Sequence, residues 1–186
     1  MIPRIRAMIA FVLMIFLLSC SAASSTEQVD NPWSQSTVGD WSEYKTVIGP
    51  MVALTRLTVT AKDEKNVTIE RRVTREDFVK TFTQHIPLDK PWTRSILTPP
   101  PSVTVKNVGD GTETLTIGGK EYKCLWVKIR ATTQNMDDTL TIWRCNEVPV
   151  DGLVKAVGVT KNGEGSISEV LVGFGHVDLK AGAAKQ

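Results

Sequence analysis

The sequence holds few of the residues that enzymatic and metal chemistry require. It has two histidines, His85 and His176, and neither has acidic or cysteine side chains at a metal-ligand spacing. It has no nucleophile-elbow pattern and no Ser-x-x-Lys motif, and its glycine-containing stretches at 163–165 and 173–175 stand in strand and turn contexts. We therefore expect a protein that is not an enzyme and that binds no metal or cofactor.

The sequence also lacks an apolar run long enough to cross a bilayer, which takes about 20 residues. Its longest run, from Ile9 to Leu18, follows Arg4 and Arg6 and precedes small, hydroxylated residues. This order is typical of a secretory signal peptide, which we place at residues 1–19. Without that segment 20 basic side chains stand against 20 acidic ones, so no basic excess is available to bind nucleic acid.

Cysteine is scarce, and the first of the three cysteines ends the signal segment. The motif Leu-Leu-Ser-Cys at residues 17–20 resembles a bacterial lipobox, which implies cleavage before Cys20 and attachment of fatty acyl chains such as palmitate to that residue. Ser21, in place of an aspartate, then favours the outer membrane, with the domain facing the periplasm. The alternative is cleavage near residues 21–23, which would discard Cys20 and leave a secreted protein.

Composition divides the rest of the chain into a tether, a domain and a tail. Residues 20–36 are rich in Ser, Thr, Gln and Asn and lack apolar periodicity, which is typical of a tether. Trp33 is the large apolar residue of this segment, and docking of Trp33 on the domain is the alternative. Residues 37–176 suffice for one β-domain with a core of ordinary size, and residues 177–186 form a C-terminal tail.

From residue 37 onward apolar and polar residues alternate with a period of two, which indicates strands with one dry and one wet face. Residues 57–62 and 67–73 alternate in this way on either side of a polar turn, and Arg71 breaks the apolar face. An earlier strand is expected at 38–47. Acidic pairs at 63–64 and 137–138 are expected in turns, where carboxylates are solvated.

Residues 74–88 admit two interpretations. Thr74 with Asp77 is typical of a helix start, and a short apolar stripe follows. Alternation from Phe82 to Leu88 indicates a strand instead, and several residues here are poor helix formers, so the strand is favoured. Four prolines then predict an irregular crossover at 89–102.

The segments 122–131 and 139–147 flank a polar turn at 134–135 and predict a β-hairpin. Antiparallel partners about that turn have residue numbers that sum to 269. This register gives both faces sensible partners, and a slip of one residue would lose them all. It opposes Cys124 to Cys145, Trp126 to Trp143, Val127 to Ile142, and Ile129 to Leu140.

The same register predicts a disulfide between Cys124 and Cys145. Directly opposed strand residues have Cα atoms about 4.5–5.5 Å apart, which a disulfide can span, and an exported protein meets an oxidising compartment. A redox-active pair is disfavoured because this spacing lacks the helix-start geometry that stabilises a thiolate. Reduced thiols in the core are the remaining alternative.

Two further segments, 153–160 and 167–174, predict a last hairpin around the Asn-Gly turn at 162–163. Short turns between consecutive strands favour an all-β fold, an antiparallel meander of eight or nine strands with at most one short helix. Because such a sheet has to hide its apolar face, we expect strong curvature, as a half-barrel or incomplete barrel.

Two stretches carry a resemblance to a family. Val38 to Tyr44 reads Val-Gly-Asp-Trp-Ser-Glu-Tyr, and Ile142 to Lys155 contains Trp-x-x-x-x-Val-Pro followed by Gly-Leu-Val-Lys. Together they resemble uncharacterised bacterial envelope lipoproteins, in which the second pattern recurs near the end of a curved sheet. More remotely, the order of elements is similar to the lipoprotein-localisation carriers, whose half-barrel holds acyl chains on its concave side.

Two functional hypotheses follow, both for a non-enzymatic protein held on the membrane by its lipid anchor. In the first, the concave face binds a hydrophobic ligand or acyl chain, with Trp126 and Trp143 as candidate ligand-binding residues. The other candidates for this face are Trp41, Leu57, Val59, Val67 and Ile69. In the second, the core is fully packed and the domain is a structural or protein-interaction module with an envelope protein as its partner.

Overall fold

A computed structural model gives the fold and describes residues 31–76, 78–88, 104–133, 137–160 and 166–179. The signal peptide and Cys20 lie outside these ranges, as do the expected crossover and the centres of the turns at 134–135 and 162–163. Within these ranges the chain is all-β, with nine strands, a single 3₁₀ turn and no α-helix. The expected all-β class, antiparallel meander and strand number are confirmed.

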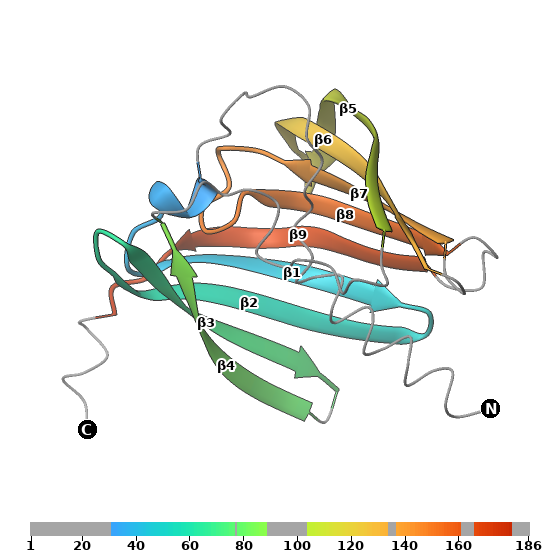
Figure 1. Cartoon of the computed structure of the whole chain (residues 1–186). Coiled ribbons are helices and arrows are strands. Elements are labelled where there is room, and N and C mark those ends of the chain that lie inside the picture. The colour runs from blue at the N-terminus through green and yellow to red at the C-terminus, as the bar shows by residue number, and fades with distance from the viewer. Residues whose placement is uncertain (1–30, 77, 89–103, 134–136, 161–165, 180–186) are drawn as a thin grey trace.

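The strands form one antiparallel sheet in the order β4-β3-β2-β1-β9-β8-β7-β6-β5 (Figure 1). The elements are η1 (Pro32–Ser34), β1 (Asp40–Ile48), β2 (Met51–Lys62), β3 (Asn66–Arg75), β4 (Phe78–Pro87), β5 (Thr104–Ile117), β6 (Lys120–Thr132), β7 (Asp137–Arg144), β8 (Leu153–Thr160) and β9 (Ser166–His176). Consecutive strands are neighbours, except that the first and last strands meet at the centre of the sheet and β4 and β5 form its two edges. The strand interpretation of residues 78–87 is therefore confirmed.

The sheet is not closed and not strongly curled, so the expected half-barrel is wrong. The expectation rested on the need to hide one apolar face. The chain meets that need in another way, because three of its own segments contribute buried residues to the same core as the sheet. They are η1, the connection between β7 and β8, and the β5–β6 tip, represented in the core by Trp33, Val148, Val150 and Tyr122.

We call the sheet face that carries Tyr44 the core face. Directly paired residues share a face, so register extends this assignment across the sheet. From β3 to β9 it includes the buried residues Val67, Ile69, Leu57, Val59, Ser42, Tyr44, Thr46, Glu169 and Leu171. The opposite side, which we call the outer face, carries half-buried and exposed residues such as Lys45 and Leu54.

The β6–β7 register agrees with the predicted one for Trp126–Trp143, Val127–Ile142 and Ile129–Leu140. The ladder ends at Leu125–Arg144, and the predicted disulfide does not form: Cys124 and Cys145 are both free thiols and both buried. The physical reason is a register shift between β7 and β8 at residues 143–144, after which the Cys145 N–H donates to the Gly152 carbonyl at 2.8 Å.

The β5–β6 hairpin changes its buried side along its length. Tyr122 and Cys124 are buried near the tip, whereas Ile129, of the opposite parity, is buried further along β6. A two-stranded ribbon twists more strongly than a wide sheet, which accounts for the change. At the tip, the ammonium of Lys120 lies 5.2 Å from the ring centre of Phe174 and 3.3 Å from a carboxylate oxygen of Glu147. The tip thus reaches the core side of β9.

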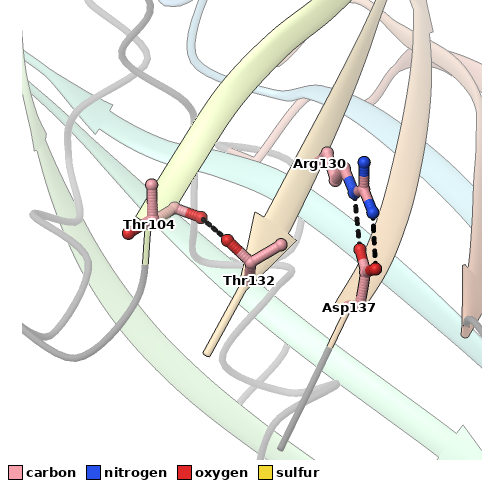
Figure 2. Close-up of polar contacts among 4 residues, drawn as sticks. All are labelled: Thr104, Arg130, Thr132 and Asp137. Carbon is pink, nitrogen blue, oxygen red and sulfur yellow. Dashed lines mark hydrogen bonds and ion pairs between the residues drawn. The ribbon is translucent and has the colours of Figure 1, made fainter. Parts of the chain in front are cut away.

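At the other end of this hairpin, Arg130 donates two hydrogen bonds of 2.5 Å to the carboxylate of Asp137 (Figure 2). The Thr132 hydroxyl donates to the carbonyl of Thr104 at 3.4 Å, which ties β6 to β5 (Figure 2). Asp137 and Asp138 are the first two residues of β7 and do not lie in the turn expected for them. Burial, followed by the charge of Asp137, raises the pKa of Asp138. The turn expected around Asp63 is confirmed.

The end of the expected tether packs on the domain. Trp33, in η1, is buried in the core, and the Ser36 hydroxyl donates to its carbonyl at 2.8 Å. The ammonium of Lys62, at the end of β2, donates to the carbonyls of Ser34 and Ser36 at 2.6 and 2.7 Å. Docking of Trp33, the alternative left open by the sequence, is confirmed.

Candidate functional site

The connection from Cys145 to Gly152, which we call the 145–152 loop, lies at the centre of the candidate site. Val148 and Val150 are both buried in it. Val150 has a φ of 75°, a left-handed conformation that is strained for a β-branched residue and typically costs about 1–3 kcal/mol. Such a conformation persists because the surrounding structure holds it in place.

Two polar side chains of β1 hold this loop. The Ser42 hydroxyl donates to the carbonyl of Pro149 at 2.8 Å, and the Tyr44 hydroxyl donates to Oδ1 of Asp151 at 2.5 Å. Ser42 and Tyr44 stand two positions apart in a strand, so both side chains project from the core face. The two stretches that carry the family resemblance are therefore in direct contact.

Asp151 is the hub of these contacts. Its Oδ1 also accepts from the backbone N–H of Leu153 at 3.1 Å, and the guanidinium of Arg144 donates to its backbone carbonyl. Burial, with the charge of Asp151 as a further cause, raises the pKa of Tyr44 well above its usual value. The phenol therefore stays a neutral donor at physiological pH and has no role as a base.

Glu169, on β9, is a second buried carboxyl group of this cluster, with only 3% of its surface exposed. The Thr46 hydroxyl donates to its Oε1 at 3.2 Å. Burial, with the charge of Asp151 as the next cause, raises the pKa of Glu169 to about 8, against the opposing charges of Arg71 and Arg144. Arg71, which breaks the apolar pattern of β3, thus has Glu169 as an electrostatic partner.

The chemistry available to this cluster is structural. It contains a neutral phenol, a buried carboxyl that is mostly protonated at neutral pH, and a carboxylate engaged by a phenol and a backbone amide. Buried hydrogen-bond networks of this kind are strong and fix one arrangement of the groups they join. The cluster therefore fastens the 145–152 loop to the centre of the sheet.

The candidate ligand-binding residues are divided between the two faces. Leu57, Val59, Val67 and Ile69 lie on the core face, as expected. By register, Trp126 and Trp143 belong to the outer-face row Trp126–Trp143–Lys155–Val170–Lys45, although Trp143 also packs against the hydrophobic core. Trp41 also lies on the outer face, since its position in β1 is of opposite parity to Tyr44. Register thus distributes these residues over rows on both faces of the sheet.

Both tryptophans of the β6–β7 pair are held by neighbours on the outer face. The indole N–H of Trp143 donates to a carboxylate oxygen of Glu113 at 2.7 Å, and the ammonium of Lys155 lies 5.3 Å from its ring centre. The ring of Trp126 lies over β5, where a Cβ placed on Gly111 would come within 3.0 Å of its Nε1. The ring of Trp126 thus covers the backbone of β5, whereas Trp143 packs against the hydrophobic core.

The thiol of Cys124 is chemically unreactive at neutral pH. Burial, followed by the proximity of Cys145 and Glu113, raises the pKa of Cys124 to about 11. Its Sγ lies 3.5 Å from the carbonyl of Tyr122, to which the thiol donates. Because the thiolate is the nucleophile, a thiol with this pKa is almost unreactive at neutral pH.

The two histidines lie at the surface. Nδ1 of His176, the last residue of β9, lies 2.9 Å from Oδ1 of Asp40, and Nδ1 of His85 lies 3.0 Å from the hydroxyl of Thr68. Burial on its own raises the pKa of Asp40, but hydrogen bonds from Thr37 and His176 give a net lowering. Across the described ranges, no three side chains of His, Cys, Asp or Glu gather as a metal site would require.

Sequence analysis did not single out Asp151 or Glu169. The available signal was the run Ser42, Tyr44 and Thr46, in which three hydroxyl groups recur every second residue on what became the core face. Polar groups that share a buried face need partners. That requirement could have prompted a search for carboxylates elsewhere in the chain.

No helix in the part of the chain that the structure describes has the length and hydropathy to cross a bilayer. No family model matches the sequence, and no curated protein matches it.

The structural neighbours of the chain include bacterial proteins described as lipoproteins. A candidate lipoprotein from Parabacteroides distasonis has a TM-score of 0.48 and 12% identity, covering 75% of this chain and 96% of that one. The hypothetical lipoprotein YmcC from Escherichia coli has a TM-score of 0.35 and 10% identity, with 84% and 100% covered. A candidate outer membrane lipoprotein-sorting protein domain from Vibrio parahaemolyticus has a TM-score of 0.30 and 6% identity, with 83% and 94% covered.

Proposed function

We propose that this protein is an exported lipoprotein, anchored through an acylated Cys20, whose β-domain is a non-enzymatic structural or protein-interaction module of the cell envelope. The lipobox-like motif at residues 17–20 supports the anchor, and Ser21 supports the outer membrane as its destination. The domain then faces the periplasm.

The observation that carries the second half of this proposal is the attachment of the 145–152 loop to the core face. The hydroxyl groups of Tyr44 and Ser42 donate to this loop, and Val148 and Val150 are buried in the hydrophobic core. Where an acyl carrier would need an open apolar surface, this chain places its own backbone and a buried polar cluster. A packed module is the function that these contacts favour.

Acylation is tested by labelling growing cells with an alkyne analogue of palmitate. The wild-type protein should carry the label and sediment with outer membranes, whereas a Cys20→Ser variant should carry none. A matched Cys124→Ser variant keeps Cys20 and should be labelled like the wild type. Label retained by Cys20→Ser would contradict the anchor.

Ligand binding is tested on the mature chain with Cys20→Ser, purified without detergent. Native mass spectrometry should show the mass of the chain alone, and a fluorescent fatty acid should not bind. A co-purified lipid, or saturable uptake of the fatty acid, would instead support carriage of an apolar ligand on the core face. Retention of uptake after Trp126→Ala and Trp143→Ala would show that those side chains take no part in it.

A further inference from the structure

The outermost hairpin of the sheet, β3–β4, carries a surface that the proposed function does not use. Three rows of directly paired residues cross it on the core-face side: Arg75 with Phe78, Val73 with Lys80, and Arg71 with Phe82. We call Arg71, Arg75, Phe78, Lys80 and Phe82 the hairpin patch. In the two outer rows an arginine of β3 is paired with a phenylalanine of β4, and Lys80 lies between the two phenylalanines on β4.

The aromatic residues of this patch are exposed. Phe78 is 49% exposed and Phe82 is 39% exposed, although both stand on the side of the sheet that is buried further inward. The ammonium of Lys80 lies 4.8 Å from the ring centre of Phe82, so cation and ring present one combined surface. Because β4 is the last strand in the sheet order, no further strand of the sheet continues this surface.

The patch has a single sign of charge. Arg75 and Lys80 are exposed, and Arg71 forms the inner boundary, where its charge faces the buried Glu169. Of the described acids of the hairpin, Glu70 is opposite Thr83 on the outer face, and Glu76 directly follows Arg75 in the turn at the end of the patch. Exposed aromatic rings flanked by lysine and arginine are typical of surfaces that lie in the interface of an anionic bilayer.

We propose that the hairpin patch docks the domain on a bilayer surface rich in anionic phospholipid, with Phe78 and Phe82 entering the interface and Arg75 and Lys80 near the phosphates. The inference rests in part on the proposed function, because an acylated Cys20 would hold a bilayer close to the domain. With Trp33 docked, the chain from residue 20 to residue 31 reaches at most about 40 Å even when fully extended. An anchor on so short a segment would keep the domain near the membrane, so a basic surface would meet the membrane repeatedly.

The test uses the mature chain with Cys20→Ser, so that binding does not depend on acylation. Its co-sedimentation is measured with vesicles of phosphatidylcholine alone and with vesicles of three parts phosphatidylcholine to one part phosphatidylglycerol. We expect binding to the anionic vesicles, weakening as salt is raised because salt screens exposed charges. We expect a pair of changes, Arg75→Gln with Lys80→Gln, to lower the partition coefficient by about tenfold or more.

A second pair, Phe78→Ser with Phe82→Thr, should lower the partition coefficient without removing its salt dependence. The matched control pair, Arg72→Gln with Val79→Thr, lies on the outer face of the same hairpin and should leave binding unchanged. Circular dichroism and urea unfolding of each variant verify that the sheet is intact, since both Phe78 and Phe82 lie on an edge strand.

Three outcomes would overturn the proposal. They are no binding to anionic vesicles at low salt, equal loss of binding in the control pair, and patch-dependent dimerisation in place of vesicle binding, which would make a second copy of the chain the occupant. Palmitate labelling reports separately on the anchor. Vesicle binding without palmitate labelling would contradict the proposed lipid anchor and support the docking surface. Labelling without vesicle binding would support the anchor and contradict the docking surface.

Discussion

The hydroxyl of Tyr44 donates a hydrogen bond of 2.5 Å to Oδ1 of Asp151, a residue 107 positions later in the chain. Tyr44 lies at the centre of the sheet on β1, and Asp151 lies in the 145–152 loop, so the bond joins the two halves of the molecule. Tyr44 is only 1% exposed, and a buried hydroxyl that loses its acceptor costs the full desolvation of that group. The contact therefore sets whether the loop stays on the sheet.

The strength of this contact is measured by a double-mutant cycle. Tyr44→Phe should lower the free energy of unfolding by about 1–3 kcal/mol, because it removes the hydroxyl and leaves Asp151 without that donor. Asp151→Asn should also destabilise, and the double variant should lose less than the sum, which reveals direct coupling. Urea unfolding of the four proteins provides the numbers, and additive losses would show that the bond does not couple loop and sheet.

The stability of the protein should depend on pH through Glu169. Its pKa is about 8 when folded and 4.5 in the ordinary reference state, so the folded protein holds a proton that the unfolded chain releases. The stabilisation from this group is fully present below pH 4.5 and is lost as pH rises through about 8, by the order of a few kcal/mol.

A Glu169→Gln variant should flatten this dependence and should be the more stable protein at the alkaline end, because glutamine has no proton to lose and can still accept from Thr46. Glu64→Gln, in the exposed turn between β2 and β3, serves as the control and should leave the slope in place. A steep decline between these pH values that survives Glu169→Gln would assign it to other groups.

The cysteines should behave as two buried thiols. Mature chain with Cys20→Ser, purified without reductant, should release two thiols to Ellman's reagent when unfolded and react very slowly when folded, because burial raises the pKa of Cys124 to about 11. If thiols appear only after reduction, Cys124 and Cys145 are bonded in the protein and the local geometry of the β7 end is different from that described.

The contact between Trp126 and β5 makes an unusual prediction for Gly111. Valine normally suits a strand better than glycine does. Here a Cβ would lie 3.0 Å from Nε1 of Trp126, so Gly111→Val should displace the ring, lower stability by about 1–3 kcal/mol and shift tryptophan emission. Thr112→Val, the next residue and on the opposite side of β5, should do neither. A stabilised Gly111→Val protein would mean that Trp126 does not lie on this strand.

Local pattern was enough to predict much of the sheet. The alternation at residues 57–73 and the shared register of Trp126–Trp143 and Ile129–Leu140 depend on neighbouring strands and short turns, and both are confirmed. The same register failed at Cys145 because a shift between β7 and β8 redirects the chain after Trp143, and nothing in the local pattern marks it.

Long-range relationships could not be predicted in this way. The pairing of β1 with β9 brings together residues more than 100 positions apart, and no local period carries that information. The size of a side chain is also a poor guide to its face of the sheet. The large side chain of Trp41 suggests a core position, whereas the core face of β1 carries Ser42, Tyr44 and Thr46. These polar residues could be buried only because the 145–152 loop and Glu169 supply partners.

The most direct test of the account is hydrogen exchange at the amides of Cys145 and Leu153, which donate to Gly152 and Asp151 at the two ends of the loop. If the loop is fastened over the core face, both amides should exchange as slowly as central amides of β1 in the wild type, and faster by about tenfold or more in Tyr44→Phe. Rapid exchange at both positions in the wild type, unchanged by Tyr44→Phe, would show that the loop leaves the core face open and would contradict the packed module proposed for this protein.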